Sequence, residues 1–99
     1  MKIENILPIG TVVELKDIQA KIMIAGYGSV SEQNPNYTWD YSGFVFPLGY
    51  SGKETILSFD AVQIRNIVTY GFQDEEQLHF MKDLEEILET IDKGSKEEV

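Results

Sequence analysis

The chain has 99 residues, 42% of them hydrophobic, with a net charge of -9, one His and no Cys. These values predict a single globular domain, and the missing cysteines favour a reducing compartment. The acidic excess argues against nucleic-acid phosphates and anionic membrane surfaces as partners. No apolar run approaches the roughly 20 residues that span a bilayer, and residues 1–7 do not resemble a signal peptide. A cytoplasmic location is therefore expected.

The first 72 residues are rich in Gly, Tyr, Val, Ile and Phe, with turn residues at about eight- to twelve-residue spacing. This pattern predicts short strands over residues 11–16, 21–27, 37–46, 55–59 and 66–71. Residues 17–20 are expected to connect the first two strands, and Gly43 is expected to mark a bulge. Asp60 is expected to cap one helical turn over residues 60–64. Alternation along the strands and the helix periodicity predict a core that includes Val13, Leu15, Ile22, Ile24, Ile67 and Leu84.

The last third of the chain predicts one amphipathic helix over residues 75–93. Asp74 and Gln77 are spaced as a capping box, Lys93 is expected in the last turn, and Gly94 is the expected stop. The predicted fold class is therefore α+β: a small antiparallel sheet of about five strands, open or curled like a barrel, followed by this helix. The domain should span residues 1–94, and residues 95–99 should form a frayed tail.

Catalytic and metal-binding patterns are weak. His79 is the only His and lies within the acidic helix, and the chain has no Cys nucleophile. One His without Cys cannot complete a usual zinc site, and no loop carries a calcium-binding ladder of acids. Glu85 and Glu89 lie one turn apart, but on an acidic helix such carboxylates are usually solvated. The sequence therefore predicts no enzyme activity, no cofactor and no metal.

Two features indicate a surface that binds another protein. Aromatic residues fall on both faces of the 37–46 strand, so one row can pack in the core while another, around Trp39 and Tyr41, is left for a partner. The helix carries Asp83, Glu86 and Glu89 at three-residue spacing, on a face suited to a basic partner. Simple core packing and a solvated helix face are the alternatives. The candidate partner-binding residues are Trp39, Tyr41, Asp83, Glu86 and Glu89.

Five ordered blocks carry a family resemblance: residues 7–16, 21–26, 39–43, 47–50 and 71–72. They resemble a family of small proteins of unknown function from Gram-positive bacteria, found beside LXG toxins of the type VII (Esx-type) secretion system. The resemblance covers about residues 7–80 and brings no catalytic residues. It implies a cytoplasmic chaperone or adaptor that keeps a toxin soluble or delivers it to the secretion machine. Relatives commonly carry a basic residue where this chain has Tyr27, which leaves partner specificity at that position in question.

The leading hypothesis is thus a non-enzymatic accessory factor whose partner is a co-encoded secreted toxin. The alternative is an immunity-like inhibitor, in which the acidic helix occupies a basic cleft of a toxin domain. A second copy of the same chain is a further partner that the sequence leaves open. Nucleic acid and membrane insertion are not expected.

Overall fold

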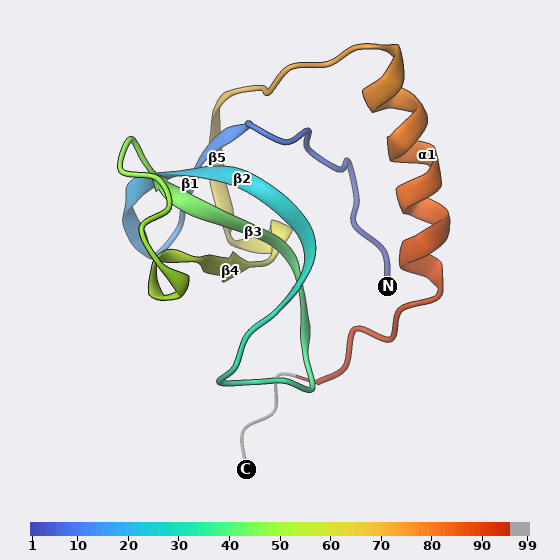
Figure 1. The fold of residues 1–99 in the computed structure, drawn as a ribbon, viewed down its shortest axis with the longest axis horizontal. Helices are drawn as coiled ribbons and strands as arrows, with labels where there is room; N and C mark the ends of the chain where they lie inside the picture. Colours follow the sequence, from blue (N-terminus) through green and yellow to red (C-terminus); the bar gives the residue numbers. More distant parts are fainter. Residues whose placement is uncertain (96–99) are drawn as a thin grey trace.

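The structure, a computed structural model, describes residues 1–95 of the chain. Five antiparallel strands form one sheet in the order β4-β3-β2-β1-β5, and a single α-helix follows (Figure 1). The elements are β1 (Val12–Leu15), β2 (Ile18–Val30), β3 (Thr38–Phe46), β4 (Leu57–Phe59), β5 (Ile64–Thr69) and α1 (Glu75–Glu89), with 3-10 turns η1 (Lys53–Thr55) and η2 (Ala61–Gln63). The predicted α+β class is confirmed. The sheet is strongly curved but does not close into a barrel, because β4 and β5 remain its two edges.

The β1–β2 hairpin forms as the alternation predicts, with Val13 opposite Ile22. The predicted connection over residues 17–20 is wrong, because the turn is tighter. β2 begins directly after Asp17, and its first residue, Ile18, already pairs with Leu15. β2 also continues past the predicted end to Val30, since it pairs with β3 along most of its length.

The predicted irregularity near Gly43 is present, but the extra residue lies on the partner strand. Ile24 pairs with Gly43 and Gly26 pairs with Ser42, which leaves Ala25 as the bulged residue of β2. A β-carbon at Gly43 would lie 2.4 Å from the carbonyl oxygen of Met23. Glycine is therefore needed here for the close approach of two strands.

A one-turn helix links the two edge strands, as predicted. Asp60 caps η2 in a complete capping box: its side chain accepts from the Gln63 backbone, and Gln63 Oε1 accepts from Asp60 N at 2.8 Å. The strand bounds on either side differ from the prediction. β4 starts only at Leu57, because residues 53–55 form η1, and β5 starts at Ile64, two residues early.

The N-terminal segment, residues 1–10, lies between the sheet and α1 (Figure 1). Two sheet tyrosines hold it at Leu7: Tyr27 Oη donates to Leu7 O at 2.6 Å, and Leu7 N donates to Tyr41 Oη at 3.1 Å. At the other end of the segment, the Met1 amino group donates to the carbonyl oxygens of Leu88 and Ile91 near the end of α1. The segment thus links the end of α1 to the sheet.

The core joins the inner sheet face, the N-terminal segment and α1. Its buried members are Ile3, Leu7, Val13, Leu15, Ile22, Ile24, Tyr41, Phe59, Leu84 and Leu88. Five of the six predicted core residues are fully buried, and Ile67 is partly buried and packs against the cluster. The strand phases and the helix phase are thus confirmed.

The helix ends earlier than predicted. α1 stops at Glu89, and Thr90 caps it with its hydroxyl donating to Ile87 O at 2.7 Å. The prediction that Lys93 lies in the last turn is therefore wrong. The chain beyond α1 instead runs to the start of β3, where Thr38 N donates to Lys93 O at 2.8 Å and Gly94 forms a bridge with Tyr37. Of the predicted frayed tail, only Ser95 lies within the described residues. Within residues 1–95, no helix is both long enough and apolar enough to cross a membrane.

Candidate partner-binding surface

The start of α1 is set by Asp74, whose side chain accepts from Gln77 N at 2.9 Å. The reciprocal half of the predicted capping box does not form, and Gln77 Oε1 is buried without a hydrogen-bond partner in residues 1–95. Glu75 and Glu76 follow in the first turn, where carboxylates interact favourably with the helix dipole. The helix start is thus the predicted one.

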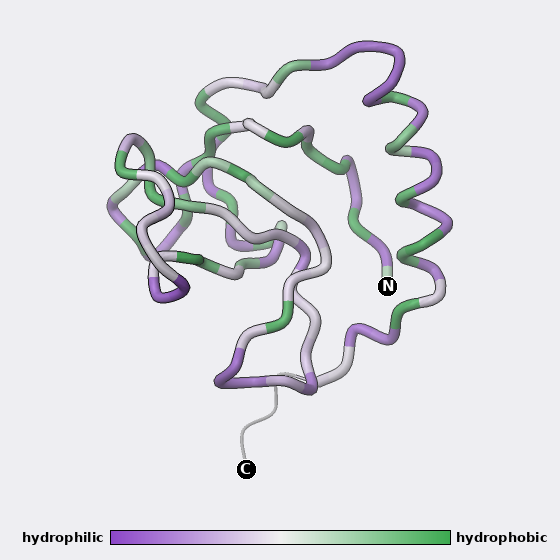
Figure 2. Tube along the Cα trace, viewed as in Figure 1, coloured by the Kyte–Doolittle hydropathy of each residue, from purple (hydrophilic) through white to green (hydrophobic). Residues whose placement is uncertain are grey.

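α1 leaves much of its apolar surface in solvent. Only Leu84 and Leu88 are fully buried, whereas Leu78, Phe80 and Ile87 keep 55%, 46% and 51% of their surface exposed. Figure 2 shows hydrophobic and hydrophilic residues alternating along the turns of this helix. The helical spacing places Phe80 and Ile87 on one flank of the buried stripe and Leu78 on the other. An exposed apolar surface of this kind is typical of an interaction site.

The same helix carries a dense negative charge, with six acids against one lysine. The predicted residues Asp83, Glu86 and Glu89 are all exposed. None of the three forms an ion pair with another residue of the described chain. Their charges are therefore available to a partner.

A groove of about 710 Å³ runs between the N-terminal segment and α1. It is lined by Met1, Lys2, Ile3, Ile6, Lys82, Glu85, Glu86, Leu88 and Glu89. Two of the predicted acids, Glu86 and Glu89, thus share one groove, and Asp83 lies outside it. The groove exists because the N-terminal segment lies beside α1, an arrangement that no local sequence pattern indicates.

Tyr41 does not belong to an exposed surface. Its side chain is fully buried, stacks on Phe59 with ring centroids 5.6 Å apart, and accepts the Leu7 N–H bond described above. Burial raises the pKa of the Tyr41 hydroxyl, against the opposing effect of that backbone bond. The expectation of an exposed Tyr41 is therefore wrong, because its face of β3 is the core face.

Trp39 lies apart from the acids of α1. It is partly buried, and its ring meets Tyr37 edge-on with centroids 4.9 Å apart. It lines a hollow of about 390 Å³ with Ser31, Gln33, Asn34, Ile56, Leu57 and Ser58, at the β4 edge of the sheet. The structure thus brings together Glu86 and Glu89 but does not join them to Trp39 or Tyr41.

Tyr27, the position where the chain departs from the family pattern, makes internal contacts. Its ring packs between Tyr41 and Phe80, with centroids 5.8 and 6.5 Å away. Burial and the neighbouring Tyr41 raise the pKa of Tyr27 to about 12. Tyr27 thus connects the sheet to the N-terminal segment through its hydroxyl and to the first half of α1 through its ring.

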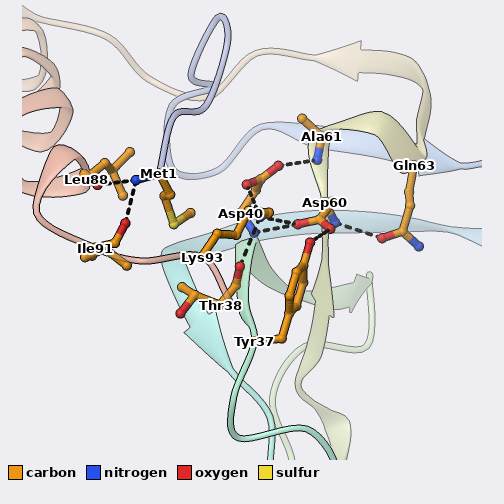
Figure 3. A network of polar contacts seen from close by, with 10 residues as sticks. All are labelled: Met1, Tyr37, Thr38, Asp40, Asp60, Ala61, Gln63, Leu88, Ile91 and Lys93. Atoms are coloured by element: carbon orange, nitrogen blue, oxygen red, sulfur yellow. Dashed lines mark hydrogen bonds and ion pairs between the residues drawn. The ribbon is translucent and has the colours of Figure 1, made fainter. Parts of the chain in front are cut away.

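A buried polar cluster, which the sequence did not indicate, ties the chain beyond α1 to the sheet. Figure 3 shows Lys93 reaching between Asp40 and Asp60, with Nζ 2.7 and 2.9 Å from their Oδ1 atoms. Lys93 Nζ also donates to Thr38 O at 3.0 Å and lies 4.8 Å from the centre of the Tyr37 ring. Asp40 and Asp60 are only 7% and 4% exposed. We call these four side chains, Tyr37, Asp40, Asp60 and Lys93, the lysine clasp.

Within the lysine clasp, the oxygens of both carboxylates accept hydrogen bonds. Asp60 Oδ1 accepts from Asp40 N at 2.9 Å, its Oδ2 accepts from the Tyr37 hydroxyl, and Asp40 Oδ2 accepts from Ala61 N at 2.8 Å. Burial by itself lowers the pKa of Lys93, but the hydrogen bonds to Asp40 and Asp60 outweigh it and raise the pKa above its ordinary value. Burial and the bond to Asp60 also raise the pKa of Tyr37. Lys93 therefore stays charged, and the clasp holds the chain that follows α1 against the start of β3.

His79 is exposed on α1. Replacing it with Ala is expected to change the free energy of unfolding by less than about 0.5 kcal/mol, because an exposed helical position without buried contacts tolerates substitution. Partner binding should be unchanged as well. Thermal unfolding and a binding titration check both expectations. A well-folded His79→Ala protein without biological activity would show that His79 has a chemical role.

A family model described as a domain of unknown function (DUF4176) matches residues 6–80, and the chain therefore belongs to that family. The matched residues include the whole sheet and the first residues of α1. The groove acids and Lys93 lie beyond the matched segment. Neither a curated protein nor a solved structure matches the chain.

Proposed function

We propose that this member of the DUF4176 family is a non-enzymatic, cytoplasmic protein-binding factor that serves as chaperone or adaptor for a secreted LXG toxin of the type VII system. The observation that carries the proposal is the surface of α1, where half-exposed Leu78, Phe80 and Ile87 lie among carboxylates that form no ion pair within residues 1–95. A helix that only supported the fold would turn its apolar stripe inward and its polar face outward. The apolar surface left over is suited to cover an apolar segment of another protein.

The charge of α1 indicates the chemistry of that partner. Six acids and one lysine on a single helix favour a segment that is basic as well as apolar. The carboxylates would chiefly raise the association rate and exclude acidic partners, and the apolar contacts would supply the affinity. The resemblance to proteins found beside LXG toxins supports such a toxin as the partner.

A genetic experiment tests the proposal in a host that encodes the toxin. Deleting the gene should reduce the toxin in the culture supernatant and in the soluble cell fraction, while growth of the producing cells is unaffected. Wild-type protein should restore export. A Leu78→Ser/Ile87→Ser variant should not, because it removes apolar surface from both flanks of α1.

The matched control is Leu48→Ser/Val62→Ser, which removes two side chains that are 80% and 69% exposed elsewhere on the molecule. This variant should restore export. Unchanged export together with self-poisoning of the deletion strain would favour the immunity-like inhibitor. Normal export and normal growth without the gene would contradict both functions.

A further inference from the structure

One flank of α1 carries a row of exposed side chains in which acidic and apolar residues alternate. Glu76, Phe80, Asp83 and Ile87 follow one another at steps of four, three and four residues, and all four are exposed. Such steps place side chains next to one another along one side of a helix. The row is about 16 Å long, because eleven residues separate its ends. We call these four side chains the α1 seam.

The apolar members of the α1 seam are held in place but not covered. Phe80 packs against the ring of Tyr27, with centroids 6.5 Å apart, and still exposes 46% of its surface. Tyr27 is itself fixed by its hydrogen bond to Leu7 O. Ile87 lies two turns further along α1 and is 51% exposed. A side chain that is already packed on one side loses little conformational freedom when a partner covers the other side. Both side chains therefore offer apolar contact area to a partner.

The α1 seam carries two negative charges and no positive one. Neither Glu76 nor Asp83 forms an ion pair with another residue in the range 1–95. The one lysine of α1, Lys82, is four residues after Leu78 and so lies on the opposite flank. On β2, which meets the seam through Tyr27, the one lysine is six residues, or about 20 Å, from that tyrosine. Lys or Arg on a partner would therefore complement the charge of the seam.

We infer that the α1 seam binds an amphipathic helix of the partner protein, one side of which alternates Lys or Arg with large apolar side chains. Two helices pack side by side when residues at steps of three and four meet along their length. In that arrangement the cations face Glu76 and Asp83, and the apolar side chains cover Phe80 and Ile87. The inference rests on the proposed function and assigns binding to one flank of α1, which leaves Leu78 outside the contact.

A synthetic probe and the full chain test the inference. The probe is a fluorescent peptide of about 18 residues, five helical turns, that alternates Lys and Leu at steps of three and four residues. It should bind and shift the resonances of the Phe80 ring and the Ile87 methyl groups, and leave those of Leu78 unchanged. A peptide with Glu in place of every Lys should not bind. Failure of the Lys peptide to bind, or equal binding of the two peptides, would overturn the inference.

Charge reversal on the two flanks of α1 separates the seam from overall charge. Glu76→Lys/Asp83→Lys should weaken binding of the Lys peptide by about tenfold or more at about 0.15 M salt, since two favourable pairs become repulsive. Glu85→Lys/Glu89→Lys changes the net charge equally at exposed positions on the other flank. It should weaken binding less than about threefold, because the Debye length of about 8 Å is shorter than the helix diameter of about 10 Å. Equal weakening by both variants would contradict binding at the seam.

Apolar substitutions give a second comparison that leaves the charge unchanged. Ile87→Ser should weaken binding of the Lys peptide by about fivefold or more, because half of this side chain would be buried only in the complex. Leu78→Ser removes a side chain that is 55% exposed on the other flank and should change binding less than about twofold. A larger effect of Leu78→Ser than of Ile87→Ser would show that the peptide binds the wrong flank for this inference.

The native partner distinguishes this inference from the proposed function. If the toxin binds the wild-type protein and is affected to the same extent, or not at all, by the two double charge variants, the seam inference fails and the proposed function stands. If the toxin binds the wild-type protein and is weakened chiefly by Glu76→Lys/Asp83→Lys, both are supported. If it does not bind the wild-type protein, the proposed function fails, and the inference that depends on it fails too.

Discussion

Replacing Lys93 with Met is expected to lower the free energy of unfolding by about 3 kcal/mol. The change removes the ammonium that contacts both Asp40 and Asp60, and these carboxylates are almost fully buried. Breaking a buried pair from one side costs about 3–5 kcal/mol, and the lower value applies because the Lys93 side chain is 31% exposed. Chemical denaturation of both proteins measures the difference.

Lys53→Met is the matched control. Lys53 lies 3.8 Å from Glu32, but both side chains are more than four-fifths exposed. Its loss should therefore cost less than about 0.5 kcal/mol. Similar destabilisation by the two substitutions would contradict a structural role for the lysine clasp.

The lysine clasp also predicts how stability depends on pH. Because the pKa of Lys93 is raised in the folded protein, the clasp contributes fully below the ordinary lysine pKa of 10.5 and is lost as the pH rises through the folded value. Above about pH 10.5, wild-type stability should fall by up to about 1.4 kcal/mol per pH unit more steeply than that of Lys93→Met. If the free energies of unfolding of the wild type and of Lys93→Met fell in parallel above about pH 10.5, the proposed contribution of charged Lys93 would be contradicted.

Gly71→Ala is expected to destabilise the fold by about 3 kcal/mol or to prevent folding. A β-carbon at this position would lie 2.0 Å from the carbonyl oxygen of Ile9 and 2.9 Å from Thr11 N. Both atoms are backbone, so no side-chain rotation relieves the overlap. The end of β5 would separate from the segment before β1, and the bond from Gly71 N to Thr11 Oγ1 would be lost.

Gly49→Ala is the control for glycine conformation alone. Gly49 has a φ of 76°, but a β-carbon there would meet nothing within 4 Å. Gly49→Ala should lower the free energy of unfolding by about 1 kcal/mol, because only the left-handed backbone conformation disfavours alanine there. Thermal unfolding compares the two variants. A smaller effect at Gly71 than at Gly49 would show that the segments separate without cost.

Local periodicity predicted the sheet and the helix well. Alternation placed Val13 and Ile22 on the same buried face, and the three- and four-residue spacing placed Leu84 inward. The capping chemistry of Asp60 and Asp74 also fixed two helix starts, because these bonds involve residues only three apart. Such features depend on neighbours in the sequence and are therefore visible there.

Features that join distant parts of the chain were not predictable in the same way. Aromatic residues occupy both faces of β3, so alternation could not show that Tyr41 faces the core. The apolar pattern continues to Ile91, so periodicity could not show that α1 ends at Glu89. It also could not show that Lys93 contacts residues more than thirty positions away in the sequence. Nothing local in the sequence indicates that Asp40 and Asp60 meet at Lys93.

Among the candidate partner-binding residues, local features were again predictable and long-range contacts were not. The exposed acids Asp83, Glu86 and Glu89 could be predicted, since they lie opposite the buried stripe or beside it. The groove that contains two of them depends on where residues 1–10 lie (Figure 1). That segment is held by Tyr27, Tyr41 and the end of α1, which are all distant from it in sequence.

The most direct test of partner binding through α1 is the association rate of the purified toxin with wild-type protein and with Asp83→Lys/Glu86→Lys/Glu89→Lys. At low ionic strength the triple variant should associate at least about tenfold more slowly, because three attractive charges become repulsive. The difference should largely disappear near about 1 M salt, and the melting temperature should barely change, since all three side chains are exposed. An unchanged association rate at low salt would contradict a role for the acidic helix in binding.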